Sequence, residues 1–321
     1  MENTLVIWAF LILVTSGCSV SAWLSKPPRE LTEISPSRSS PTEVPAKKNP
    51  SSTPTPQFSP TETSIPPTQP PATDRPSMTP NPSPTEIALD LRPTVIGTSV
   101  AGRPLEVYRF GYGSQNRMII AGIHGGYEWN TIALAHKLVE YIHDHPDFIP
   151  PGKRLYILVA LNPDGEARSH GYGGRANDNG VDINRNFPVH WQADWNPQGC
   201  WDVLPITGGS GPASEPETQA LMRFVRTHSL GALISYHSAA LGIFPGGKPP
   251  DPNSTRLAEA IAAISTYPYP PMDGGCEFTG QLVDWTSSLG IASVDVELTN
   301  HEDLDFEQNL EILQVFLNWE P

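Results

Sequence analysis

The chain of 321 residues has a formal net charge of −14 at pH 7, from 20 Lys and Arg against 34 Asp and Glu. This acidic balance argues against a nucleic-acid partner, because binding to phosphates depends on clustered positive charge. About half of the 36 prolines lie before residue 90, so the composition does not support one uniform fold over the whole length.

Residues 1–23 are typical of an export signal. The apolar stretch LVIWAFLILV is too short to span a membrane readily, and small residues follow it up to Cys18. The sequence VTSGC resembles the bacterial lipoprotein signal, in which the cysteine is lipidated. Ordinary secretion and an uncleaved anchor are the alternatives, since no Lys or Arg precedes the apolar core and Thr15 stands where leucine is more usual. All three place the remaining chain outside the cytoplasm.

Residues 24–89 are rich in Pro, Ser and Thr and cannot bury enough apolar surface to offset the entropy lost on folding. We expect a disordered, semi-rigid stalk that holds the next domain away from a membrane. Residues 90–321 then form one folded domain, with 14 Lys and Arg against 27 Asp and Glu, a balance of −13. We expect this domain to be a monomer.

Strands and helices alternate along the domain. The segment TVIGTSVAGRPLEVYRFG (94–111) alternates apolar and polar residues around Gly-Arg-Pro, which predicts a hairpin. Apolar runs predict further buried strands, and apolar residues at helical spacing predict helices. The predicted strands cover residues 117–122, 154–161, 232–236 and 292–298, and the predicted helices cover residues 129–143, 216–228, 254–266, 282–289 and 306–319.

Local signals refine this pattern. Ser214, with Glu217 three residues later, predicts a capping box at the helix 216–228. Residues 171–211 are rich in Gly, Asn and Asp and predict a long functional loop region. The alternation of strands and helices predicts a layered α/β fold with a mixed or mostly parallel sheet. In such folds, loops at the C-terminal ends of strands carry the chemistry.

Three potential metal ligands stand at the ends of predicted strands. His124 and Glu128 follow the strand 117–122 in AGIHGGYEWN, and His237 follows the strand 232–236. Two imidazoles and a carboxylate, with a fourth position open to water, form a ligand set of catalytic zinc. Each residue alone could equally be a loop histidine, a solvated glutamate or a structural histidine, so the hypothesis depends on their combination.

Cys200 and Cys276 are the two cysteines of the domain. In a compartment where disulfides persist they could form a bridge, and two separate buried thiols are the alternative.

The blocks NPDG (162–165), GGRAND (173–178) and GVDINRNFP (180–188) occur in this order between the potential ligands. Together with HGGYEWN and ISYHS, they resemble the zinc carboxypeptidase family of the carboxypeptidase A type, in its compact bacterial branch of murein peptide amidase-like and γ-D-glutamyl-diaminopimelate peptidases. The resemblance covers nearly all of residues 90–321. It implies a three-layer α/β/α fold around a mixed, mostly parallel sheet.

The resemblance also implies one Zn²⁺ per chain, bound by His124, Glu128 and His237. Asp182 would accept a hydrogen bond from His124 and fix the orientation of its ring. Glu297, in VDVEL, looks like the general base that takes a proton from water and returns it to the leaving amine.

Further residues correspond to the substrate-binding part of the family site. Arg175 resembles the arginine that stabilises the oxyanion, and Asn184 with Arg185 would hold the terminal carboxylate of the substrate. Val283, before the Asp-Trp pair, falls where the family sets its preference for the terminal side chain, and an apolar residue there argues against a specificity for basic residues alone. The family's tyrosine over the substrate has no counterpart just before that pair, so Tyr269 or Phe278 would take its place, and only Tyr269 has a hydroxyl.

One departure concerns the ligands themselves. The family spaces its first two ligands as His-x-x-Glu, whereas three residues separate His124 from Glu128. We predict that Gly125 and Gly126 take up the extra residue in a bulge, because glycine allows unusual backbone conformations, and that Glu128 still faces the metal.

These features favour a zinc metallocarboxypeptidase outside the cytoplasm, attached through an N-terminal lipid or anchor, that hydrolyses the last amide bond of peptides with a free terminal carboxylate. Cell-wall peptides and scavenged peptides are both open as substrates. The alternatives are a deacylase of N-acyl amino acids from the same superfamily and a non-catalytic surface-binding lipoprotein with a degenerate metal site.

Overall fold

The computed structural model of this protein describes residues 92–196 and 199–321. The predicted export signal with Cys18 and the Pro/Ser/Thr-rich stalk lie outside the described residues, so their assignments stay predictions. Among the helices of the described part, none has the length and apolar character needed to cross a membrane.

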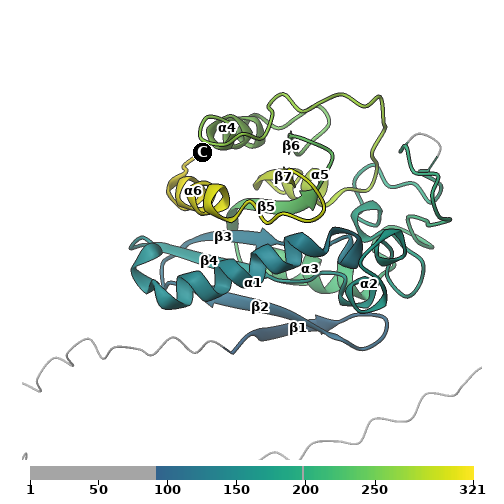
Figure 1. Ribbon diagram of the computed structural model, residues 1–321, viewed down its shortest axis with the longest axis horizontal. Helices are drawn as coiled ribbons and strands as arrows, with labels where there is room; N and C mark the ends of the chain where they lie inside the picture. Colours follow the sequence, from purple (N-terminus) through teal and green to yellow (C-terminus); the bar gives the residue numbers. More distant parts are fainter. Residues whose placement is uncertain (1–91, 197–198) are drawn as a thin grey trace, which may run out of the picture. The chain divides into compact units, whose positions relative to one another are not determined.

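Seven strands form one mixed sheet in the order β1-β2-β4-β3-β5-β7-β6 (Figure 1). The central strands β4, β3, β5 and β7 run parallel, whereas β1 and β2 at one edge and β6 at the other pair antiparallel with their neighbours. The predicted mixed sheet is therefore confirmed, with its parallel strands in the centre. The strands are β1 (Thr94–Thr98), β2 (Pro104–Phe110), β3 (Gln115–Ile120), β4 (Lys153–Leu158), β5 (Leu230–Ser238), β6 (Ile243–Pro245) and β7 (Ala292–Leu298).

Helices cover both faces of the sheet, which confirms the three-layer α/β/α fold (Figure 1). On one face, α1, α4 and α6 pack against strand residues such as Ile119. On the other face, α3 and α5 pack against the next residue, Ile120, and its neighbours. Successive strand residues point to opposite faces, so strands buried on both sides read as apolar runs. The helices are α1 (Trp129–Asp144), α2 (Pro163–Arg168), α3 (Pro216–Thr227), α4 (Pro252–Ala262), α5 (Leu282–Ser287) and α6 (Phe306–Asn318).

The predicted capping box of α3 is wrong. The helix begins at Pro216, its N-cap residue is Glu215, and no side chain caps it. The Ser214 hydroxyl donates to Glu215 Oε1 instead (2.6 Å), and Glu217 accepts a hydrogen bond from the Val100 amide (3.0 Å). Proline is favoured at the first helical position, so Pro216 starts the helix one residue later than a Ser214 cap would.

Two elements were not predicted from the sequence. The helix α2 starts at Pro163, and the Asn162 side chain caps it by accepting a hydrogen bond from the Gly165 amide (2.9 Å). The strand β6 has only three residues and pairs with β7 at the sheet edge. A strand this short carries no readable alternation, whereas the Asn-Pro start of α2 was a usable helix signal.

The loop of the first hairpin is bound to α2 through Asp164, a residue of the NPDG block. Its buried carboxylate accepts hydrogen bonds from the Ser99 hydroxyl (2.6 Å), the Ala101 amide (3.0 Å) and the Arg103 guanidinium (2.7 Å). Charged hydrogen bonds of this kind are stronger than neutral ones. The contact fixes α2, which in turn packs against the turn that holds two of the potential metal ligands.

Candidate metal centre and pocket

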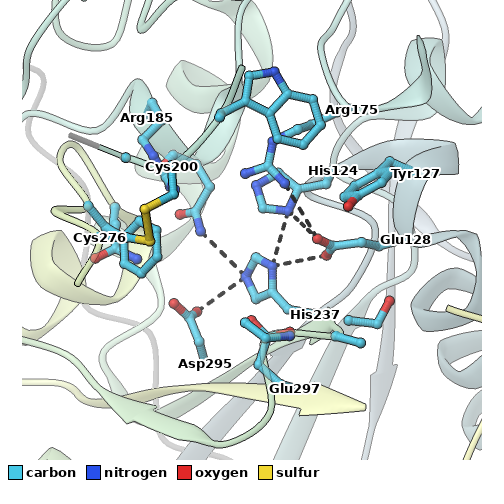
Figure 2. Close-up of a pocket in the computed structure, with 18 of the residues that line it drawn as sticks. His124, Tyr127, Glu128, Arg175, Arg185, Cys200, His237, Cys276, Asp295 and Glu297 are labelled. Atoms are coloured by element: carbon cyan, nitrogen blue, oxygen red, sulfur yellow. Dashed lines mark hydrogen bonds and ion pairs between the residues drawn. A yellow bond between two sulfur atoms is a disulfide. The ribbon is translucent and has the colours of Figure 1, made fainter. Parts of the chain in front are cut away.

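The three potential metal ligands converge at the C-terminal ends of two neighbouring parallel strands (Figure 2). His124 follows β3, and His237 is the penultimate residue of β5. The Glu128 carboxylate lies between the two rings, with Oε1 2.6 Å from His124 Nδ1 and Oε2 3.0 Å from His237 Nδ1. The two Nδ1 atoms are 3.3 Å apart, and all three side chains are buried. A buried cluster of two nitrogens and a carboxylate fits zinc, which such ligands bind.

The turn between the first two ligands accommodates the extra residue. Residues Gly125–Glu128 form a short 3₁₀ turn, in which Gly125 has φ of +49°. The turn lies so close to residues 165–174 that a Cβ on Gly126 would be 2.2 Å from the carbonyl oxygen of Ser169. The predicted bulge is thus a 3₁₀ turn, and Glu128 faces both histidines as predicted.

A second layer of polar groups holds the outer side of each histidine ring. His124 Nε2 lies 3.3 Å from Asp182 Oδ1, and Arg175 Nε donates to Asp182 Oδ2 (2.8 Å). His237 Nε2 lies 3.0 Å from the Ser235 hydroxyl and 3.3 Å from Asp295 Oδ1. Asp182 and Ser235 at these positions orient the rings so that the opposite nitrogens face the candidate metal position.

Asp295 was not identified from the sequence, although a signal was present. It lies two residues before Glu297 in β7, and side chains two apart on a strand share a face. Both acids line the pocket that contains the three ligands. The alternation in VDVEL was thus a usable but unused signal for Asp295.

The pKa values of three carboxyl groups of the site are shifted in different directions. Burial opposes the ionisation of Asp182, but Arg175 and His124 outweigh it and hold its pKa well below the usual range. Burial likewise opposes the ionisation of Glu128, yet His124 and His237 keep its pKa low. Burial raises the pKa of Glu297 to about 7 in the absence of a metal ion. A carboxyl group with a pKa near neutrality is suited to accept and return a proton.

Glu297 and Arg175 both line the pocket, on different elements. Glu297 stands opposite His237 in the β5–β7 pairing, and its Oε2 accepts a hydrogen bond from the Ala240 amide (2.9 Å). The Arg175 guanidinium lies over the ring of Trp201, with Cζ 4.7 Å from the ring centroid, and its Nη1 is 3.7 Å from Glu128 Oε1. A positive charge therefore lies beside the candidate metal ligands.

Arg185 is a buried cation, and the described part of the chain places no carboxylate within 4 Å of it. Its guanidinium carbon lies 4.4 Å from the Trp195 ring centroid and 5.0 Å from that of Phe278. Burial lowers its pKa to about 10, so it remains charged at neutral pH. The neighbouring Asn184 accepts a hydrogen bond from the Leu282 amide (2.9 Å), and its Nδ2 lies 3.4 Å from His237 Nε2. The Arg185 Nη1 also donates a hydrogen bond to the Asn184 carbonyl oxygen (2.8 Å). A buried guanidinium that lines a pocket and has no carboxylate of the described residues within 4 Å suits an anionic ligand.

Two long loops meet at the pocket wall. A disulfide joins Cys200 to Cys276, which are 76 residues apart, with a Cα–Cα distance of 5.5 Å. Of the two alternatives left open by the sequence, the structure shows the bridge. Both cysteines line the pocket together with Phe278.

Two expected substrate-binding residues lie elsewhere. Val283 is buried in the apolar core between α3, α5 and the sheet, because α5 turns this side chain inward, and it does not line the pocket. Tyr269 packs against the core on the other face and does not line the pocket either. Phe278 does line it, and the tyrosine of the pocket is Tyr127, the residue directly before Glu128.

Comparison with known proteins finds a family model, curated relatives and solved structures that resemble this chain. The family model described as zinc carboxypeptidase matches residues 90–314. Murein peptide amidase A of Escherichia coli (strain K12) is 28% identical over 233 residues, which cover 70% of this chain and 89% of that protein. Carboxypeptidase A1 of Rattus norvegicus is 30% identical over 234 residues, covering 61% of this chain and 54% of that protein. The solved structure of a murein-tripeptide amidase from Escherichia coli O157 matches with a TM-score of 0.55 and 25% identity, covering 71% of this chain and 92% of that one.

The close packing of the ligand turn gives a first prediction. Gly126→Ala places a methyl group against the Ser169 carbonyl, so the turn must move, and we expect a loss of roughly 1–3 kcal/mol in the free energy of unfolding together with weaker zinc binding. Urea denaturation and zinc titration of the purified protein measure both. Gly211→Ala is the matched control, since its Cβ would meet nothing within 4 Å. Equal stability and zinc affinity in the two variants would contradict the packing argument.

A second prediction concerns Glu297 in chelator-treated protein. Its folded pKa of about 7 lies above the ordinary 4.5, so the folded state binds the proton more tightly than the unfolded state. The stabilisation is present below pH 4.5 and is lost as the pH rises through 7, by up to about 3 kcal/mol. We expect Glu297→Gln to gain stability relative to the unsubstituted chain between pH 5 and pH 8, as measured by urea denaturation. Parallel pH curves for both proteins would show that the carboxyl group is not perturbed.

Proposed function

The chain belongs to the zinc carboxypeptidase family, and from that premise we propose that it is a zinc-dependent carboxypeptidase that hydrolyses the amide bond next to a peptide's free terminal carboxylate. The observation that carries the proposal is the pairing of two features in one pocket. One is the cluster of His124, Glu128 and His237, and the other is the buried guanidinium of Arg185. Together they provide a place for a metal ion and a place for a carboxylate.

Different residues of the pocket would carry out different steps of amide hydrolysis. A zinc ion held by His124, Glu128 and His237 would supply Lewis-acid chemistry, by polarising the scissile carbonyl and making water easier to deprotonate. Glu297 would take the proton from the attacking water and deliver it to the leaving amine, a task suited to its raised pKa. The burial of Glu297 keeps bulk water from competing for that proton.

Two arginines would hold the negative charges of the reacting peptide. Arg175 would stabilise the oxyanion of the tetrahedral intermediate, and Asp182 and Trp201 fix its guanidinium in place beforehand. Arg185 and Asn184 would bind the terminal carboxylate, so that cleavage is limited to the last residue. These roles follow from the positions of the residues in one pocket and from the family motif.

We further propose that cell-wall peptides are the substrate class and that the protein acts outside the cytoplasm. The support for the substrate class is the similarity to murein peptide amidase A over 89% of that protein. The support for the location is the predicted export signal at residues 1–23, with Cys18 as the lipidated residue, and the disulfide at the pocket, since disulfides persist in oxidising compartments. The proposed enzyme is a monomer held at a membrane by its N-terminal segment.

The direct test is hydrolysis by the zinc-loaded protein and by the same protein after chelation. We expect release of the terminal residue from peptides with a free carboxylate, a loss of at least about 100-fold after chelation, and recovery with one equivalent of zinc. Cell-wall peptides and an N-acyl amino acid are run alongside, because preferred cleavage of the latter would favour a deacylase. Equal activity before and after chelation would contradict the mechanism, and a protein that neither binds zinc nor cleaves any substrate would favour a binding protein.

A further prediction distinguishes the binding of the substrate's terminal carboxylate from the hydrolysis step. Arg185→Lys keeps the charge but loses the bidentate geometry, so we expect KM to rise roughly 10- to 100-fold with a smaller change in kcat. A peptide whose terminal carboxylate is amidated is expected to be a poor substrate for the unsubstituted enzyme. Arg168→Lys serves as the control, because Arg168 pairs with Asp178 outside the pocket lining. A fall in kcat alone, with KM unchanged, would assign Arg185 to a different step.

A further inference from the structure

Asp295 is a second acidic side chain of the pocket. Burial lowers the pKa of His237, but in the absence of a metal ion Asp295 and Glu128 outweigh burial and raise that pKa well above the usual range. It is only 3% exposed, and no Lys or Arg of the described residues lies within 4 Å of it. Its Oδ1 is 3.3 Å from His237 Nε2 but accepts no hydrogen bond of normal geometry. Figure 2 shows Asp295 on the side of His237 away from Glu128. A buried carboxylate without adequate partners is costly, so its presence in a pocket calls for an explanation.

The contact with His237 does not account for the charge. A neutral imidazole whose Nδ1 faces the metal position has one N–H, on Nε2, and Ser235 Oγ already lies 3.0 Å from that nitrogen with normal hydrogen-bond geometry. The proposed mechanism does not use Asp295, since Glu297 takes the proton and Arg185 takes the terminal carboxylate. Asp295 thus remains available to a ligand that enters the pocket.

The surroundings of Asp295 specify what such a ligand carries. Phe244 stands opposite Asp295 in the β6–β7 pairing, and Phe278 and the Cys200–Cys276 bridge line the same pocket. Apolar walls that lead to a carboxylate suit a side chain with an aliphatic stem and a cationic end, as in lysine. Aromatic rings near the path also favour a cation over an anion.

We propose that Asp295 determines specificity, by pairing with an amino or guanidinium group on the side chain of the substrate's terminal residue. This inference rests on the proposed carboxypeptidase function and narrows its substrate class. It replaces the expectation from Val283, which lies outside the pocket lining and so places no apolar limit on the terminal side chain. The substrate would then bring one negative group to Arg185 and one positive group to Asp295.

The test compares peptides that differ only in their last residue: lysine, norleucine, which has the same carbon chain without the amino group, and glutamate. For the zinc-loaded enzyme we expect kcat/KM to be roughly 10- to 100-fold higher for lysine than for norleucine, as for a charged hydrogen bond in a pocket. Glutamate is expected to be the poorest substrate. Equal rates for lysine and norleucine would overturn the proposal without any variant, while the cleavage of both would leave the carboxypeptidase function intact.

Asp295→Asn then separates specificity from the positioning of His237. If Asp295 determines specificity, kcat/KM of the variant should fall at least roughly 10-fold further for lysine than for norleucine. A carboxylate that only positions His237 predicts an equal loss for both peptides, and that result would overturn the proposal. Asp284→Asn is the matched control, since Asp284 is also a buried acid but lies outside the pocket lining, and it should keep the preference.

Zinc content is measured for each protein, so that a loss of metal is not mistaken for a loss of specificity. If Asp295→Asn does not fold or does not hold zinc, competitive inhibition of the unsubstituted enzyme by free lysine and free norleucine decides the matter. Tighter inhibition by lysine supports the pairing with Asp295, and equal inhibition overturns it. A protein that cleaves none of the three peptides would instead contradict the proposed function itself.

Discussion

The contact of one buried carboxylate with two buried imidazoles is the constraint on which the site depends. Glu128 can meet both His124 and His237 only if the ends of β3 and β5 are adjacent and the turn after β3 is tight. Burial of three such groups is unfavourable unless each is compensated. The outer contacts with Asp182 and Ser235 supply part of that compensation, and a cation at the candidate metal position would supply the rest. The geometry of the candidate metal centre therefore depends directly on the order of the strands in the sheet.

Backbone packing beneath the turn holds Glu128 in a position where it contacts both histidines. The 3₁₀ turn leaves no room for a side chain at Gly126, and the segment against which it packs contains α2 from the NPDG block. Asp164 of that block holds the first hairpin with three hydrogen bonds. Residues that look like separate motifs in the sequence therefore form a continuous support, from the sheet edge to the ligand turn. The support explains how an extra residue between two ligands leaves Glu128 in place.

The sequence predicts the parts of this structure that depend on local pattern. Apolar runs and helical spacing gave the central strands and most helices, because burial on two faces leaves a clear signature. The ligands and Asp182 could be grouped because they belong to recognisable blocks. Val283 and Tyr269 do not line the pocket, because the lining depends on how α5 and the loop before it pack, which no local pattern encodes. Asp295 was overlooked even though its spacing from Glu297 placed it on the same face of β7.

The bridge between Cys200 and Cys276 determines at what stage the wall of the pocket can be completed. It connects two loops that are distant in the sequence, and both form the wall beside Arg185 and Phe278. Thiols of newly made chains stay reduced in the cytoplasm of most cells and are oxidised only beyond it. For a chain exported as proposed, the wall beside Arg185 would therefore gain its bridge only after the chain has left the cytoplasm. The proposed carboxypeptidase would then lack its complete pocket while it is still among the peptides of the cytoplasm.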